Sequence, residues 1–255
     1  MKQHVRNLLN RFGIEIRLIK NLQAQLRDAF REQQRLAGRF DVKTIFDIGA
    51  YDGSTAIKYK QYFPDATVYS FEPFADSYSK LESNAAINSF IHPINAAVSE
   101  KCGNAILHVN RMDATNSLLP AENTDSYLDD LTRSIDEVTV KTTTIDSICK
   151  ELGVNCIDIL KIDVQGNGLA VLRGAREMLE KKKIKIIYIE IEFIQIYKDQ
   201  PLMFEITDFL NGFRYPLFGL YNLTHQKSGQ LAWGDAVYYC DELESHVRSM
   251  NEHTG

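Results

Sequence analysis

The stretch Thr44-Ile45-Phe46-Asp47-Ile48-Gly49-Ala50-Tyr51-Asp52-Gly53-Ser54-Thr55 decides the fold of this chain of 255 residues. Its first part, up to Gly49, is a short apolar run of the kind that forms a buried strand. The two glycines permit a tight turn, and Ser54 or Thr55 could cap a following helix. In an open parallel sheet such a turn lies at the carboxyl end of its strand, where ligands bind. The stretch therefore predicts a first strand followed by a binding turn.

The rest of the chain repeats this alternation of strand and helix. Short apolar runs predict further strands over 67–73, 91–98, 157–164 and 185–192. Helical spacing of apolar residues predicts helices between them over 54–63, 75–88 and 168–183. Such a chain should build a doubly wound α/β sheet. Two last β-like runs, 213–223 and 236–240, predict an antiparallel closing pair joined by a turn over 222–235.

We expect three parts along the chain. Residues 1–40 carry a basic excess and apolar residues at helical spacing, which predicts N-terminal amphipathic helices. Residues 41–245 form the main domain, with a β-hairpin and loop inserted at about 104–144, and residues 246–255 form a flexible tail. The apolar stripe of the N-terminal helices favours packing on the domain or on a second copy of the chain, so a homodimer through these helices is one expectation.

The composition excludes several classes of protein. Hydrophobic residues make up 44% and charged residues 25% of the chain, as in ordinary globular domains, and the net charge of -5 argues against a protein built to bind nucleic acid. No apolar run reaches the length of a transmembrane segment, and no cleavable leader begins the chain, so we expect a cytoplasmic protein. The four cysteines lie far apart without zinc-like spacing, which predicts reduced thiols and no bound metal.

The turn after the first strand distinguishes between two classes of nucleotide cofactor. A nicotinamide or flavin site requires Gly-x-Gly-x-x-Gly, but Tyr51 and Ser54 occupy the second and third glycine positions. This disfavours a nicotinamide-dependent redox enzyme. The carboxylates of Asp47 and Asp52 beside the turn suit a cofactor that carries a cationic amine, and S-adenosyl-methionine is such a cofactor. Glu72, where the second strand ends, is placed to accept hydrogen bonds from ribose hydroxyl groups.

At these residues the sequence resembles the class I methyltransferases that depend on S-adenosyl-methionine, and more narrowly the FkbM family. The resemblance runs from about Thr44 to Cys240 and is carried by the segments 46–55, 71–73, 95–99, 117–119, 144–146, 160–166 and 171–175. It implies a mostly parallel, seven-stranded Rossmann-like sheet with an antiparallel last strand. It also implies methylation of a hydroxyl group on a small molecule or glycan, with S-adenosyl-methionine as the methyl donor.

The resemblance also implies roles for residues along the carboxyl edge of the sheet. Around the methionine end of the cofactor it places Asp47, Gly49 and Asp52, and at the ribose it places Glu72. Near the adenine it places the turn from Asn95 to Val98, which includes Ala97. Beside the methyl group and the acceptor it places Asp163, under a loop that carries Ser117.

The sequence departs from the family's usual pattern after Asp163. Relatives commonly carry glutamates at the positions that Gln165 and Gly168 occupy here. The general base for the acceptor hydroxyl therefore stays open between four candidates, Asp163, Glu190, Glu192 and His225. Glu190 and Glu192 share one face of their predicted strand, and His225 would overhang the crevice together with Trp233.

The same departure leaves a second hypothesis open, in which a methyltransferase fold has lost catalysis and binds a partner through its N-terminal helices. Binding of S-adenosyl-methionine would favour the enzyme. A partner that is lost when residues 1–39 are deleted would favour the binding module. The sequence leaves the identity of the acceptor and the oligomeric state open.

Overall fold

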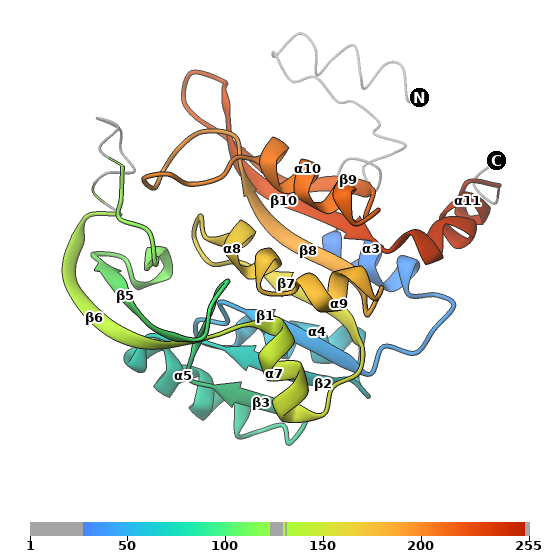
Figure 1. The fold of residues 1–255 in the computed structure, drawn as a ribbon, viewed down its shortest axis with the longest axis horizontal. Helices are drawn as coiled ribbons and strands as arrows, with labels where there is room; N and C mark the ends of the chain where they lie inside the picture. Colours follow the sequence, from blue (N-terminus) through green and yellow to red (C-terminus); the bar gives the residue numbers. More distant parts are fainter. Residues whose placement is uncertain (1–27, 123–129, 131, 253–255) are drawn as a thin grey trace, which may run out of the picture.

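The computed structural model describes residues 28–122, 130 and 132–252, which form a sheet with helices on both faces (Figure 1). Most of the predicted N-terminal helices therefore lie outside the described residues. Their last part is helix α3 (Ala29–Leu36), which packs Phe30 and Leu36 into the core of the same chain. Asp28 begins this helix, because its carboxylate accepts a hydrogen bond from the Phe30 amide at 3.1 Å.

The central sheet has seven strands in the order β3-β2-β1-β7-β8-β10-β9. The strands are β1 (Thr44–Ile48), β2 (Thr67–Phe71), β3 (Ile91–Ile94), β7 (Ile157–Ile162), β8 (Ile184–Glu192), β9 (Leu217–His225) and β10 (Leu231–Tyr239). β10 runs antiparallel to both of its neighbours, and the other pairings in this sheet are parallel. The predicted fold class, a mostly parallel sheet with an antiparallel last strand, is confirmed.

Two hydrophobic cores lie on opposite faces of the sheet. One core receives side chains from α7 (Ile145–Leu152), α8 (Gly168–Arg173), α9 (Arg176–Glu180) and α10 (Met203–Gly212). The other receives side chains from α3, α4 (Ser54–Tyr62), α5 (Ala75–Ala85) and α11 (Glu244–Glu252). Burial on both faces explains why the central strands read as continuous apolar runs rather than alternating ones.

A second, three-stranded sheet stands beside the carboxyl ends of β1 and β2 (Figure 1). It contains β4 (Ala97–Val98), β5 (Gly103–Asn110) and β6 (Ser134–Thr143), in the order β4-β6-β5. The single strand predicted over 91–98 is therefore wrong. The chain leaves the main sheet after Ile94 and pairs again only as β4, in parallel with β6. β5 and β6 form an antiparallel pair within the region of the predicted insertion. The short helix η1 (Asp113–Thr115) follows β5 and precedes β6 in the chain.

Three other predictions need correction. The closing hairpin is longer than expected, because β9 and β10 pair from Leu231↔His225 to Tyr238↔Leu217 and leave a turn over 226–230 instead of 222–235. The helix predicted over 168–183 is divided into α8 and α9, where Gly174 lies so close to Ser99 that an added Cβ would be 2.2 Å from its carbonyl oxygen. The tail expected to be flexible from residue 246 continues α11, which packs Val247 against the core.

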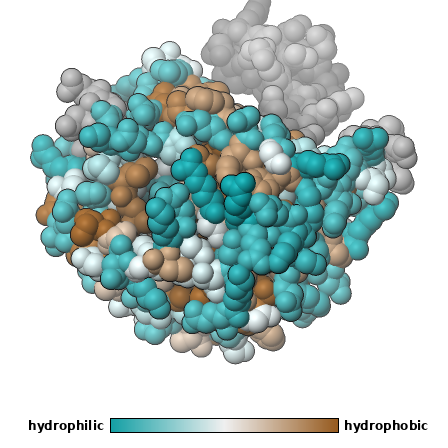
Figure 2. Space-filling model, in the orientation of Figure 1, coloured by the Kyte–Doolittle hydropathy of each residue, from teal (hydrophilic) through white to brown (hydrophobic). Residues whose placement is uncertain are grey.

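The face of the molecule drawn in Figure 2 is mainly hydrophilic over the described residues. Hydrophobic surface gathers over β5 and over α10 in this view, where Ile106 and Phe204 are exposed. In the part of the chain that the structure describes, no helix has both the length and the apolar character needed to cross a membrane.

Gly49 permits a close approach between the ends of β1 and β7. Its φ angle is +76°, and a Cβ added there would lie 1.8 Å from the carbonyl oxygen of Asp163. The Asp163 amide donates to the carbonyl of Ile48 at 3.0 Å, which holds the two chains at this spacing. A side chain at position 49 would therefore separate β1 from β7 where both strands end.

We expect Gly49→Ala to destabilise the protein by about 2–5 kcal/mol, since it combines overpacking with an unfavourable φ. Urea unfolding followed by circular dichroism measures the change. Gly212→Ala is the control, because nothing lies within 4 Å of a Cβ added there. Equal unfolding midpoints for the two variants would contradict the prediction.

Candidate active site

A cavity of about 340 Å³ lies at the carboxyl ends of β1, β2 and β7. Its wall includes residues from the turn after β1, from β4, from the loop after η1 and from the segment after β7. Among these are Gly49, Tyr51, Glu72, Ala97, Ser117, Asp163 and Gln165. The volume and the position at the carboxyl edge of a parallel sheet are those of a small-molecule site.

Backbone hydrogen bonds hold the turn after β1 in place. The amides of Gly49 and Ala50 both donate to the carbonyl of Phe71, at 3.0 and 2.9 Å. Tyr51 has a φ angle of +51°, and its amide donates to Glu72 Oε2 at 3.0 Å. The turn thus presents its backbone to the cavity and is tied to the end of β2.

Glu72 is the buried carboxyl group of the cavity wall. Glu72 is 8% exposed, and its two carboxyl oxygens accept hydrogen bonds from the backbone amides of Tyr51 and Phe74. Burial raises the pKa of Glu72 from 4.5 to about 7, against the two backbone hydrogen bonds and Lys161, which lower it. Each carboxyl oxygen keeps a free acceptor position for a hydroxyl group in the cavity.

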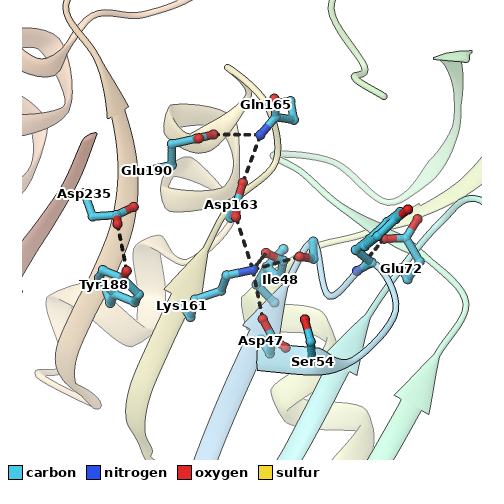
Figure 3. Close-up of polar contacts among 12 residues, drawn as sticks. Asp47, Ile48, Ser54, Glu72, Lys161, Asp163, Gln165, Tyr188, Glu190 and Asp235 are labelled. Atoms are coloured by element: carbon cyan, nitrogen blue, oxygen red, sulfur yellow. Dashed lines mark hydrogen bonds and ion pairs between the residues drawn. The ribbon is translucent and has the colours of Figure 1, made fainter. Parts of the chain in front are cut away.

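Asp47 lies behind the cavity wall, in the interior of the sheet. It is fully buried, and Lys161 Nζ approaches its Oδ1 to 3.0 Å (Figure 3). Lys161 also donates to the carbonyl of Gly49 at 2.7 Å and lies 3.7 Å from Asp163 Oδ2. Burial raises the pKa of Asp47, and Lys161 opposes this. We expected Asp47 to line the cavity. In the structure Lys161 lines it instead, and Asp47 contacts Lys161 from behind.

Asp52 and Asn95 stabilise the ends of elements around the cavity. Asp52 Oδ1 accepts a hydrogen bond from the Ser54 amide at 3.0 Å, so Asp52 satisfies the start of α4 in place of the predicted Ser54 or Thr55 cap. Asn95 Nδ2 donates to the carbonyl of Glu72 at 2.9 Å. Neither side chain belongs to the described lining of the cavity, whereas Ala97 does.

Four carboxyl groups line up across β7, β8 and β10, at the edge where β7 and β8 end and the antiparallel β10 begins. Strand register places Asp235 opposite Glu190 and Trp233 opposite Glu192. Lys161 pairs with Tyr188, so Asp163, two residues further on, faces the same side as Glu190. We call Asp163, Glu190, Glu192 and Asp235 the acidic row.

Burial makes protonation favourable for members of the acidic row. It raises the pKa of Glu192 to about 8, with Asp163 as a second cause, and raises the pKa of Glu190 well above its ordinary value, with Asp163 and Glu192 as further causes. The pKa of Asp235 is also raised by burial, although Asn222 and Tyr188 donate hydrogen bonds to it. Burial therefore favours the protonated forms of Glu190 and Glu192.

Ser117 anchors its loop on the cavity wall. Its hydroxyl donates to the carbonyl of Gln165 at 2.6 Å and accepts a hydrogen bond from the Leu119 amide at 3.0 Å. Residue 117 also forms an isolated β-bridge with His108 of β5. The loop is thereby attached both to the segment after β7 and to the second sheet.

His225 and Trp233 lie away from the described cavity wall. His225 is exposed at the end of β9, because the segment expected to be an overhanging turn is a strand. Trp233 is half-buried in β10, next to the acidic row through its pairing with Glu192. Of the four candidate bases, Asp163 lines the cavity, and its side chain is 43% exposed.

Gly168 serves the packing of α8 on β8. A Cβ at this position would lie 3.0 Å from Ile189 Cδ1, so α8 lies directly on β8. In the described parts of the chain, no three His, Cys, Asp or Glu side chains are arranged to hold a metal ion.

Sequence reasoning missed Lys161, Tyr197 and Asp235 as members of this site. Lys161 interrupts the apolar pattern of β7, which is rich in isoleucine. Because a lysine in a buried strand requires a partner of opposite charge, this interruption could have identified Lys161 as a site residue. Tyr197 and Asp235 reach the site only through the loop after β8 and the antiparallel pairing of β10, so no local pattern identified them.

We expect Lys161→Met to destabilise the protein by about 3–5 kcal/mol, because it leaves the buried Asp47 carboxylate without its partner. The double variant Asp47→Leu/Lys161→Met should recover most of this loss, since no charge is then left buried. Urea unfolding of both variants tests this. Lys101→Met is the control, as Lys101 is 85% exposed and its ion pair with Glu100 spans 3.8 Å. An additive double variant would contradict the prediction.

Known proteins resemble this chain in sequence and in fold. It is 28% identical over 176 residues to the 2-O-methyltransferase NoeI of Sinorhizobium fredii. This alignment covers 66% of this chain and 71% of NoeI. It is 27% identical to the methyltransferase sdnD of Sordaria araneosa, over 52% of this chain and 60% of sdnD. A precorrin-6y C5,15-methyltransferase from Geobacter metallireducens has a TM-score of 0.45 at 12% identity, covering 83% and 87% of the two chains.

The methyltransferase FkbM domain matches residues 47–217, the part of the chain that carries the cavity and most of the sheet. The match begins at Asp47, at the partner of the buried lysine, and ends at the first residue of β9. This protein belongs to the FkbM methyltransferase family and is a methyltransferase that depends on S-adenosyl-methionine.

Proposed function

We propose that this methyltransferase transfers the methyl group to a hydroxyl group of a sugar or another small molecule. The observation that carries the proposal is the position of Asp163, where the cofactor cavity meets the acidic row. Hydroxyl groups donate hydrogen bonds to carboxylates and must lose a proton during methylation, so both needs are met at this point. The name of NoeI, a 2-O-methyltransferase, supports an oxygen acceptor.

The residues of the cavity fit S-adenosyl-methionine. When bound, this cofactor supplies a methyl group on a cationic sulfur. Glu72 would accept hydrogen bonds from the ribose hydroxyls with the acceptor positions that its backbone contacts leave free. Val98, Leu107 and Leu118 give the wall an apolar part that suits the adenine. The Gly49 turn allows close backbone approach, and Asp163 supplies negative charge.

Asp163 is the residue that we propose as general base. Its carboxylate lies in the cavity wall and is accessible, so it can take the acceptor proton as the oxygen bonds to the methyl carbon. Glu192 is 4% exposed, and Glu190 Oε2 accepts a hydrogen bond from Gln165 Nε2 at 2.9 Å. His225 lies at the exposed end of the β9–β10 hairpin. Lys161 Nζ lies 3.7 Å from Asp163 Oδ2.

A cytoplasmic location and a homodimer through residues 1–40 are further parts of this proposal. Because α3 packs on its own domain, such a dimer would use the residues before it. The alternative, a binding module without catalysis, becomes the conclusion if the cofactor binds and no acceptor is methylated.

We expect the affinity for S-adenosyl-methionine to increase as pH rises from 6 to 8. Because its pKa is about 7, Glu72 ionises over this range, and the ionised carboxylate is the stronger acceptor for ribose hydroxyls. Glu72→Gln should weaken binding by about tenfold, or 1.4 kcal/mol, and should remove this part of the pH dependence. Isothermal titration at several pH values measures both effects.

The ligand titrates equally in both proteins, so the difference between the two pH profiles isolates Glu72. Glu82→Gln, an exposed carboxyl change on α5, is the matched control and should leave affinity unchanged. Parallel pH profiles for the wild type and Glu72→Gln would refute the assignment of Glu72 to the ribose.

We expect methyl transfer to a hydroxylated acceptor, with the new methyl group on oxygen, when the protein is screened with isotope-labelled cofactor against glycans and small alcohols. Asp163→Asn should lower kcat by about 10²–10⁴-fold, the usual contribution of a general base. Mass spectrometry and NMR of the product locate the methyl group. Methylation at nitrogen or carbon, or an Asp163→Asn variant with undiminished kcat, would overturn this assignment.

A further inference from the structure

Gln165 joins three separate parts of the site. Its Nε2 donates to Asp163 Oδ1 at 3.0 Å and to Glu190 Oε2 at 2.9 Å (Figure 3). Its Oε1 accepts a hydrogen bond from the Tyr197 hydroxyl at 3.2 Å, and its main-chain carbonyl accepts one from the Ser117 hydroxyl at 2.6 Å. Gln165 thus connects the segment after β7 to three other parts of the site, which are β8, the loop after β8 and the loop after η1.

An amide can make these contacts and a carboxylate cannot. The amide nitrogen has two hydrogens, and each one here is directed to a different carboxylate. A glutamate at position 165 would place a third acidic group about 3 Å from the other two. Such a group would have to be protonated or would force protons onto its neighbours, because like charges at this distance cannot all ionise.

The backbone fixes the position of this amide before any ligand binds. Gln165 has a φ angle of +50°, an unfavourable conformation for a residue with a side chain. The Ser117 hydrogen bond holds its carbonyl, and the Tyr197 hydroxyl, which also donates to the carbonyl of Thr115 at 2.8 Å, holds its side chain. Tyr197 is 1% exposed, so this arrangement is part of the packed interior.

Other charged and titratable groups face this cluster from each neighbouring element. Lys161 on β7 supplies positive charge beside Asp163. Acidic or phenolic groups face it from β1, β8, β10 and the loop after β8, namely Asp47, Glu192, Asp235 and Tyr197. With so many acids present, a neutral donor at position 165 decides how many protons the cluster holds.

We propose that Gln165 is a positioning residue for methyl transfer, whose amide aligns Asp163 with Glu190 and keeps Asp163 available as the proton acceptor. The inference rests on the proposed function. In the step itself the acceptor oxygen forms the bond to the methyl carbon, the carbon–sulfur pair returns to sulfur, and the hydroxyl proton passes to the Asp163 carboxylate. Gln165 donates hydrogen bonds throughout and exchanges no proton. This explains how the site functions without the glutamate at that position.

The first test compares pH profiles of kcat/KM for the wild type, Gln165→Glu and Gln61→Glu. In Gln165→Glu the acidic limb of the profile should move upward by about one pH unit or more, because a third carboxyl group raises the pKa of its neighbours. Gln61→Glu adds the same charge at an exposed position of α4 and should leave the profile in place. A Gln165→Glu profile that overlies the wild type would overturn the proposal.

Gln165→Met keeps the length of the side chain and removes its donors. We expect kcat to fall by about 10–100-fold through misalignment of Asp163, while KM for the acceptor and Kd for the cofactor change less than about threefold. A purely structural role would instead change KM, Kd and thermal stability together. An unchanged kcat in this variant would contradict the positioning role.

A measurement without an acceptor separates the inference from the proposed function. NMR titration of carboxyl carbons in ¹³C-labelled protein reports the ionisation of Asp163 directly. Its pKa should be higher in Gln165→Met than in the wild type, since a hydrogen bond to the ionised form is lost. If the wild type methylates no acceptor, the proposed function fails, yet this titration still decides whether Gln165 controls Asp163. Equal pKa values for Asp163 in both proteins would refute the inference.

Discussion

The ion pair between Asp47 and Lys161 joins the carboxyl ends of β1 and β7, on which the rest of the site is built. Both residues are buried, so each charge would be very unfavourable without the other. Lys161 uses its remaining hydrogen-bonding capacity on the Gly49 carbonyl, and it reaches toward Asp163. The strands β1 and β7 approach so closely at Gly49 that only a residue without Cβ fits. Two interactions therefore position the turn that faces the cofactor. One is the contact of Lys161 with the Gly49 carbonyl, and the other is the close backbone contact between Gly49 and Asp163.

Negative charge in the site is distributed according to the partners that each carboxyl group has. Asp47 has a lysine, Glu72 has two backbone amides, and Asp163 has both Lys161 and the Gln165 amide. Burial raises the pKa values of Glu190 and Glu192, and the neighbouring Asp163 raises them further. In this arrangement an ionised base and neighbouring protonated acids can coexist near neutral pH, as acid–base chemistry on an alcohol requires.

Local patterns in the sequence were sufficient for the strands and for the turn after β1. The apolar runs of β1, β2, β7 and β8 stand out because those strands are buried on both faces. The same reasoning missed β4 as a separate strand, and it predicted the antiparallel β9–β10 pair with too long a turn. β4 has only two residues, and β9 exposes much of its length, so neither shows a continuous apolar run. Their pairing partners, β6 and β8, are distant in the sequence and compensate for weak local signals.

The sequence by itself determined the fold class, the family and the place of the cofactor turn, because these depend on short-range periodicity and on glycines at fixed spacing. Only the tertiary structure decided which polar residues act together. Asp47, expected in the cavity wall, lies in the interior, and His225, expected over the crevice, lies at an exposed strand end. Gln165 hydrogen-bonds to both Asp163 and Glu190. The physical reason is that pKa values and hydrogen-bond partners depend on burial and on contacts between strands far apart in the chain. Those contacts exist only once the sheet has assembled.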